Sequence, residues 1–206
     1  MTTKPPYLLI DIDGVLNPFP GPGGSLPPDY RPHRVDLNGT DVPIWLNPDH
    51  GAWITKLHST GLVRPIWATS WQNAAARTID PRLGLDAYPH IDLGPTRQLT
   101  RHPNGYLWKR DAVATWAARS PLVWIDDDFA YPDHEWARQR ALNGVPTLLI
   151  QPDPYQGLQR VHIDAVRTWA LAVTRNAHTN GDRDDVAAHS PPLAAAAHTS
   201  RSEGSY

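Results

Sequence analysis

The segment Tyr7–Asn17, which reads Tyr-Leu-Leu-Ile-Asp-Ile-Asp-Gly-Val-Leu-Asn, is an apolar run that stops at two carboxylates. Its first part, Tyr7–Ile10, is short and almost wholly apolar, which is typical of a central strand buried on both faces. Asp11 and Asp13 follow at spacing i, i+2, and Gly14 then allows a sharp turn. Because side chains alternate along a strand, both carboxylates project to the same side if the extended backbone continues through Asp13.

Two carboxylates held this close repel each other in a partly buried site, and a divalent cation relieves the repulsion. Oxygen ligands suit Mg²⁺ best. Open α/β sheets bind ligands at the carboxyl ends of their strands, so we expect a metal-assisted carboxylate site there. Asp-x-Asp-Gly alone also fits a plain turn or a calcium loop, although Asn17–Pro20 lacks the regular oxygen ligands that a calcium loop needs.

Composition narrows the classes of protein that remain. With 206 residues the chain is long enough for one well-buried domain. A net charge of −2 provides no global positive field for nucleic acid or membranes, and the absence of cysteine excludes disulfides and zinc–sulfur sites. We recognise no signal peptide and no run of ~18 apolar residues. These features predict a cytoplasmic protein without a membrane partner, and they leave its oligomeric state open.

Apolar runs alternate with helical patterns along the chain. This alternation predicts an α/β fold, a doubly wound, mostly parallel, Rossmann-like sheet of about five strands. The expected strands are 7–10, 62–68, 90–93, 122–125 and 147–150, and the expected helices are 49–60, 71–78, 108–119, 133–143 and 156–173.

Two other segments do not belong to this sheet. The Pro- and Gly-rich residues 18–32 predict a loop, and residues 33–46 predict a hairpin around Asn38-Gly39. Together they make a small β-hairpin flap at about 17–47, within a domain of residues 1–174. Residues 175–206 have no hydrophobic periodicity, and we expect a disordered tail there.

Four polar clusters follow predicted strands or begin predicted helices: Asp11/Asp13, Thr69/Ser70, Lys109 and Asp126–Asp128. Because parallel strands share one carboxyl edge, these clusters can converge and supply the parts that phosphoryl transfer needs. Each cluster also has a simpler interpretation. Thr69-Ser70 could cap a helix, Lys109 could be a solvated helix lysine, and Asp126–Asp128 could be a solvated turn.

The four clusters, in this order, resemble the motifs of the haloacid dehalogenase (HAD) superfamily of phosphatases. The resemblance covers roughly residues 7–150. Asp11–Asn17 looks like the first motif, Ile66–Ser70 like the second, Lys109 like the third and Val123–Asp127 like the fourth.

The resemblance implies a role for each matched position. Asp11 would be the nucleophile that forms an aspartyl-phosphate, and Asp13 would be the acid/base. Thr69, the Ser70 N–H and Lys109 would bind the phosphoryl group.

For the metal, the resemblance implies Mg²⁺ held by Asp11, the Asp13 carbonyl and Asp127, with Asp126 close by. The triple aspartate leaves this register uncertain by one residue. Gly14 would complete the substrate loop. An aspartate at position 13 favours phosphate esters over carbon–halogen bonds.

Neither gap between the motifs is long enough for a full cap domain, so the resemblance implies an open site that suits a large phosphorylated substrate. Arg97–Arg110 is basic and contains Tyr106 and Trp108, a combination that suits nucleic acid as a partner, although an ordinary basic loop is an equal interpretation. The first two motifs look similar to the HAD domains associated with bacterial RNA-repair proteins. We therefore expect a Mg²⁺-dependent phosphatase, with polynucleotide ends as the leading substrate. The alternatives are a phosphatase of nucleotides or sugar phosphates, and a non-catalytic phosphate- or partner-binding scaffold.

Overall fold

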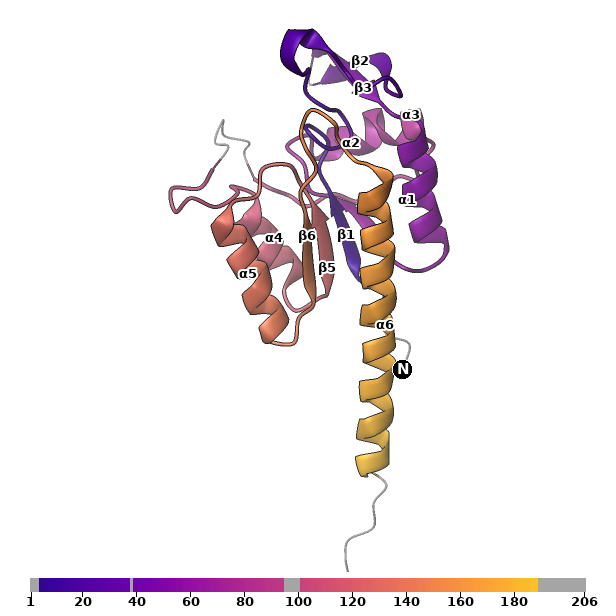
Figure 1. The fold of residues 1–206 in the computed structure, drawn as a ribbon, viewed down its shortest axis with the longest axis vertical. Helices are drawn as coiled ribbons and strands as arrows, with labels where there is room; N and C mark the ends of the chain where they lie inside the picture. The colour runs from indigo at the N-terminus through magenta and orange to yellow at the C-terminus, as the bar shows by residue number, and fades with distance from the viewer. Residues whose placement is uncertain (1–3, 38, 95–100, 189–206) are drawn as a thin grey trace, which may run out of the picture.

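A parallel four-stranded sheet forms the centre of the protein (Figure 1). The structure, a computed structural model, describes residues 4–37, 39–94 and 101–188, with backbone alone from residue 177. The strands run in the order β4-β1-β5-β6, and they span β1 (Tyr7–Ile10), β4 (Arg64–Trp67), β5 (Leu122–Ile125) and β6 (Thr147–Ile150). Ile10 pairs with Trp67 on one side and with Ile125 on the other. The residues that follow β1, β4 and β5 therefore share one edge of the sheet.

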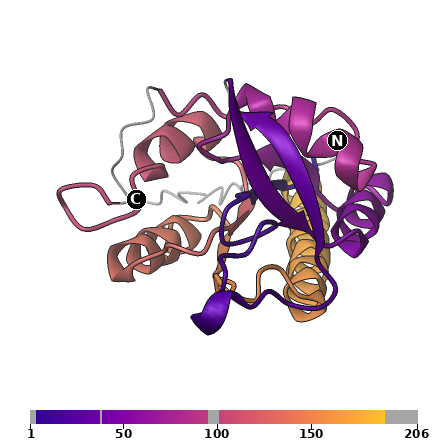
Figure 2. The ribbon, with the colours of Figure 1, turned by 90° about the horizontal axis from the view of Figure 1, so that it is seen from above.

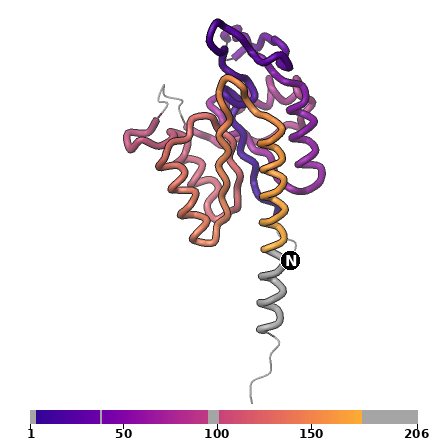
Figure 3. The backbone as a smooth tube through the Cα atoms, in the orientation of Figure 1, coloured from indigo at the N-terminus to yellow at the C-terminus, as the bar shows by residue number. Residues whose placement is uncertain are grey.

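Helices cover both faces of this sheet, as the alternation of strands and helices predicts. Helices α1 (Asp49–Ser59) and α6 (Arg160–Ala188) cover one face, and α4 (Arg110–Ala117) and α5 (Tyr131–Leu142) cover the other (Figures 1 and 3). Along β1, Leu8 and Ile10 belong to the core on the α1 and α6 side, whereas Leu9 belongs to the core on the α4 side. All three are at most 1% exposed, which confirms the doubly wound architecture.

The structure corrects two of the expected elements. The strand expected at 90–93 is reduced to one isolated bridge between His90 and Trp67, so the sheet has four strands where about five were expected. Pro89 accepts the Trp67 N–H and Trp67 accepts the Ile91 N–H, and the segment then leaves the sheet edge. The closing helix α6 continues to Ala188, so residues 175–188 are helical where a tail was expected. Residues 189–206 lie outside the described part of the chain.

The predicted hairpin is confirmed as β2 (Arg31–Leu37) and β3 (Thr40–Leu46), a separate antiparallel pair. Figure 2 shows it crossing above the end of the sheet. Val35, Ile44 and Leu46 are buried in the core on the α1 side, which fixes the hairpin to the domain. The proline-rich loop before it contains a short 3₁₀ turn, Pro22–Gly24, and Asn38 at the hairpin tip lies outside the described residues.

Only short helices follow β4, namely α2 (Asn73–Thr78) and α3 (Asp80–Leu83). Neither they nor the hairpin forms a domain over the sheet edge, so the described residues contain no full cap, in agreement with the expectation. None of the described helices has the length and apolar character to span a bilayer.

Candidate active site

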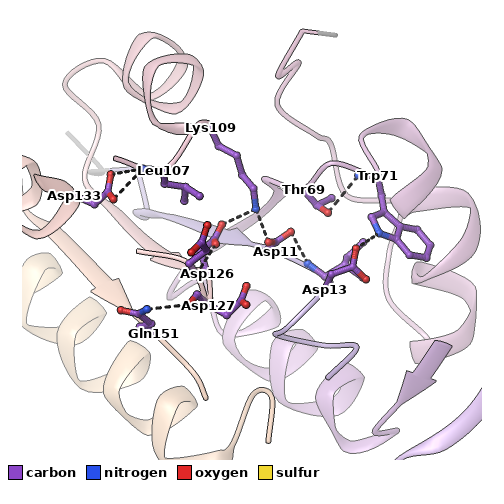
Figure 4. Close-up of polar contacts among 12 residues, drawn as sticks. Asp11, Asp13, Thr69, Trp71, Leu107, Lys109, Asp126, Asp127, Asp133 and Gln151 are labelled. Carbon is purple, nitrogen blue, oxygen red and sulfur yellow. Dashed lines mark hydrogen bonds and ion pairs between the residues drawn. The ribbon is translucent and has the colours of Figure 1, made fainter. Parts of the chain in front are cut away.

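Lys109 joins two of the predicted acidic clusters at the carboxyl edge of the sheet (Figure 4). It immediately precedes α4 and is only 4% exposed. Its Nζ donates to Oδ2 of Asp11, which follows β1, and to Oδ2 of Asp126, which follows β5, at 2.7 Å. The other oxygen of Asp11 accepts the Ile12 N–H at 2.8 Å. The two carboxylates, 115 positions apart in the numbering, are thus held by one buried cation.

Asp127 completes an acidic triad with Asp11 and Asp126. Carboxylate oxygens of the three residues lie within 4.8 Å of one another, close enough to share a metal ion. Asp127 packs against Gly14, whose φ of +73° belongs to the left-handed region. A Cβ added at Gly14 would lie 2.7 Å from Oδ1 of Asp127 and closer still to its Cγ and Oδ2. Glycine is therefore required at position 14 both for the turn and for the place of the Asp127 carboxylate.

Asp13 lies at the same cavity but is held by different partners. Its Oδ2 accepts a hydrogen bond from Nε1 of Trp71 at 2.8 Å, and its Oδ1 accepts one from Nδ2 of Asn17 at 2.9 Å. Its side chain is not part of the triad of Asp11, Asp126 and Asp127. The metal contact that the resemblance implies for Asp13 is made by its backbone carbonyl and does not call on this side chain.

An open cavity of about 420 Å³ brings most of the predicted site residues together. Its lining includes the predicted residues Asp11, Asp13, Ser70, Lys109, Asp126 and Asp127. Two predicted residues lie behind the lining: Gly14, against Asp127, and Thr69, which is fully buried and accepts the Trp71 N–H at 3.4 Å. Phe19, 44% exposed, and the half-buried Trp108 add aromatic surface to the cavity.

Burial and crowding shift the ionisation of these groups. Burial by itself would lower the pKa of Lys109, but the carboxylates of Asp11 and Asp126 outweigh it and raise that pKa above its ordinary value. Burial raises the pKa of Asp126, against the opposing charge of Lys109, and burial together with Asp11 raises the pKa of Asp127 to about 6. The pKa of Asp13 is raised by burial, which its hydrogen bonds from Trp71 and Asn17 oppose. The cavity therefore holds more carboxyl groups than Lys109 alone can keep ionised, a condition that a bound cation relieves.

Three further residues, to which the sequence analysis assigned no role, support the site. Besides Trp71 and Asn17, the fully buried Asp133 near the start of α5 accepts the Leu107 N–H at 3.0 Å and the Ala130 N–H at 2.9 Å. Asp133 thereby anchors the segment that carries Lys109. An aspartate at the third position of a helix with proline near its start is a recognisable capping pattern, so the sequence did contain a signal for Asp133.

The basic segment expected to contact nucleic acid is largely paired within the protein. Arg101 forms an ion pair with Asp128 at 2.8 Å, and Arg110 lies 3.6 Å from Asp133 with its guanidinium over the Tyr106 ring. His102 stacks on the same ring at 4.2 Å. Arg97 lies outside the described residues. Within its described residues, 101–110, the segment thus offers aromatic surface at Trp108 more than free positive charge.

Comparison with known proteins bears on this geometry. No curated protein and no solved structure matches the chain. A family model described as the HAD domain in Swiss Army Knife RNA repair proteins matches residues 7–163, which include all four motifs and the whole central sheet. Membership of this family supports a phosphatase-type hydrolase in general terms. With the motifs converging at one sheet edge and the match covering most of its length, the chain belongs to the family of HAD domains in Swiss Army Knife RNA repair proteins.

Proposed function

We propose that this protein is a Mg²⁺-dependent phosphatase that hydrolyses phosphate monoesters through an aspartyl-phosphate on Asp11. The observation that carries the proposal is the buried Lys109 between Asp11 and Asp126 at the floor of an open cavity. A fixed cation beside a carboxylate stabilises the charge that develops on a transferring phosphoryl group. It also keeps the nucleophile in one orientation.

In the first step, an oxygen of Asp11 attacks phosphorus as the bond from phosphorus to the ester oxygen breaks. Asp13, on the same cavity wall, gives its proton to the departing oxygen. Lys109 and the Ser70 N–H contact the equatorial phosphoryl oxygens, and Thr69 supports this turn from behind.

In the second step, water attacks the phosphorus of the aspartyl-phosphate and gives a proton to Asp13. The bond from phosphorus to Asp11 then breaks, which releases inorganic phosphate and restores both carboxyl groups to their starting forms. Asp13 thus acts first as an acid and then as a base. Burial raises its pKa and its two hydrogen bonds oppose that rise, a balance that suits a group which must both give and take a proton.

The donor set fits Mg²⁺, because the triad of Asp11, Asp126 and Asp127 offers only carboxylate oxygens and carries an excess of negative charge. Asp127 is the stronger candidate for direct ligation, since Asp126 already gives one oxygen to Lys109 and accepts the Asp128 N–H with the other at 3.2 Å. When bound, the ion would neutralise the carboxylates and polarise the phosphoryl oxygens.

Turnover of an aryl phosphate such as p-nitrophenyl phosphate tests this proposal. We expect hydrolysis with Mg²⁺, loss of hydrolysis with EDTA, and no turnover by Asp11→Asn. Asp164→Asn, on the exposed surface of α6, is a matched control and should retain wild-type activity. Full activity of Asp11→Asn, or no activity of the wild type with Mg²⁺, would contradict the proposal.

The leading substrate class is a polynucleotide with a terminal phosphate. Three observations support it: the family's RNA-repair description, the absence of a full cap in the described residues, and the aromatic pair Phe19 and Trp108 at the cavity. Aromatic side chains bind unpaired bases by stacking, worth about 1–3 kcal/mol per base.

A substrate panel separates this class from small metabolites. We expect kcat/KM for oligonucleotides with a 3′- or 5′-phosphate to exceed that for mononucleotides and sugar phosphates, and Trp108→Ala to reduce this preference about tenfold or more. Equal rates on free nucleotides and oligonucleotide ends would favour the small-metabolite alternative.

A further inference from the structure

The carboxyl group of Asp13 is held on both of its oxygens by side chains to which the resemblance assigns no role. Trp71 donates to Oδ2 at 2.8 Å, and Asn17 donates to Oδ1 at 2.9 Å (Figure 4 shows the Trp71 bond). Asp11, two residues earlier, is held instead by Lys109 and the Ile12 N–H. The two carboxylates of the first motif are therefore oriented by separate sets of donors.

Trp71 is a rigid partner for Asp13. It is only 5% exposed and belongs to the core on the α1 side, and its backbone N–H is directed at the Thr69 hydroxyl. The indole N–H is a donor and never an acceptor, so an acceptor at this place stabilises the buried Trp71. The Asp13 carboxylate supplies it, and the fixed indole in return defines the plane of the carboxyl group.

Asn17 connects Asp13 to the hairpin. Its Oδ1 accepts the backbone N–H of Trp45 in β3 at 2.9 Å, so the amide nitrogen is the end that faces Asp13. Its backbone carbonyl also accepts the Gly14 N–H at 2.8 Å, which closes the turn after the first motif. The orientation of Asp13 is thereby tied to the position of β3 above the sheet edge.

We propose that Trp71 and Asn17 are positioning residues that fix the Asp13 carboxyl group for proton transfer to the leaving group, with the hairpin anchored through Asn17. This inference rests on the proposed function, in which Asp13 is the acid/base. With both oxygens held, the proton of Asp13 is delivered from one direction, into the cavity that Asp13 lines. In the proposed step neither side chain touches the reacting atoms, so both act on catalysis through Asp13.

Leaving-group dependence distinguishes positioning from general structural support. An alkyl phosphate has a basic leaving group that needs the proton, whereas p-nitrophenolate leaves readily without one. General acid catalysis contributes about 10²–10⁴-fold. We expect Trp71→Phe, which keeps the ring and removes the N–H, to lower kcat for an alkyl phosphate by at least about tenfold. Its kcat for p-nitrophenyl phosphate should stay within about threefold of wild type.

The chain offers a matched control in Trp67. Its buried indole Nε1 also donates to an aspartate, Asp80, at 3.1 Å, but away from the cavity. Trp67→Phe therefore removes an equivalent hydrogen bond, and it should lower thermal stability without changing the ratio of alkyl to aryl turnover. A changed ratio in Trp67→Phe as well would overturn the inference, because the effect would then be a general loss of structure.

Asn17→Asp is the second variant. It keeps the acceptor for the Trp45 N–H but replaces the donor to Asp13 by a carboxylate. We expect the same selective loss on the alkyl phosphate, and this variant decides the matter if Trp71→Phe does not fold. Equal losses of turnover on both substrates, or no loss on either, would overturn the positioning role. Aryl phosphate turnover by the wild type would in that case still support the proposed function. A wild type inactive on both phosphates would instead count against the proposed function itself.

Discussion

Gly14 and Asp127 are in such close contact that the Asp127 carboxylate fits only because Gly14 has no side chain. The backbone of Gly14 turns at φ +73° directly against the Asp127 carboxylate, although the two residues follow different strands. This contact fixes where Asp127 lies relative to Asp11.

Gly14→Ala should impair Mg²⁺ binding more than it impairs folding. The left-handed backbone costs an alanine about 1–2 kcal/mol, and the new Cβ also displaces Asp127. Gly84→Ala is the matched control, since Gly84 has φ +63° and nothing within 4 Å of its Cβ position. Calorimetric Mg²⁺ titration should show weaker binding for Gly14→Ala and unchanged binding for Gly84→Ala. Equal Mg²⁺ affinities in the two variants would exclude the contact as the cause.

Lys109→Met should abolish most turnover and destabilise the protein. Removal of one electrostatic donor to a transition state costs about 10²–10³-fold in kcat. Breaking a buried ion pair from one side costs about 3–5 kcal/mol, because Asp11 and Asp126 are then left buried without their cation. Denaturant unfolding in EDTA should show this loss, and added Mg²⁺ should recover part of it. Lys56→Met, at an exposed position of α1, should change neither property.

Asp133→Ala should lower both stability and turnover, although Asp133 does not line the cavity. The substitution leaves the buried Leu107 N–H without an acceptor, at a cost of about 1–3 kcal/mol, and loosens the segment that carries Lys109. We expect a lower melting temperature and a fall in kcat of about tenfold. Asp36→Ala removes an acceptor of the Gly39 N–H in the exposed hairpin and should leave kcat unchanged. A wild-type kcat for Asp133→Ala would refute the anchoring role.

His50 should make the protein acid-sensitive. Burial lowers the pKa of His50 from 6.5 to about 4, and its Nε2 lies 2.9 Å from the Leu158 carbonyl. The unfolded chain therefore binds more protons than the folded one between about pH 4 and 6.5, so the free energy of unfolding falls as the pH falls through this window. The full contribution is about 3 kcal/mol.

His50→Gln keeps a donor for Leu158 and has no titrating ring, so its unfolding free energy should fall less steeply in acid. Urea unfolding at several pH values measures the difference in unfolding free energy between the two proteins. Burial raises the pKa of Asp80 to about 6, but this contribution is the same in both proteins and cancels in the difference. Parallel pH curves for the two proteins would rule out His50 as the source.

Much of the fold could be predicted because its central strands are short apolar runs. The predicted bounds of β1, β5 and β6 coincide with those observed, because each apolar run is preceded by a proline and followed by a polar residue. Residues 90–93 have a similar pattern, but only His90 pairs with β4. Whether an apolar run at a sheet edge becomes a strand depends on tertiary packing that the sequence pattern does not contain.

The site could be predicted at the level of motifs but not of contacts. The three consecutive aspartates after β5 left the register of the metal ligands uncertain by one residue, because the sequence does not contain the burial that distinguishes them. Asp126 is inaccessible and contacts Lys109, whereas Asp127 is half-buried beside Gly14. Trp71 was missed for a similar reason. A tryptophan usually signals core packing, and its bond to Asp13 joins residues 58 positions apart.

The central position of β1 has a consequence for how long Asp11, the proposed nucleophile, keeps its place at the sheet edge. The Asp11 N–H donates to the Ile125 carbonyl at 3.1 Å, and the strand before it is paired on both sides. Fraying of α6 or opening of the hairpin leaves these bonds intact, so amide exchange with deuterium at this position requires the sheet itself to come apart. Proteolytic trimming or thermal loosening of the periphery should therefore leave Asp11 in place until the whole molecule unfolds.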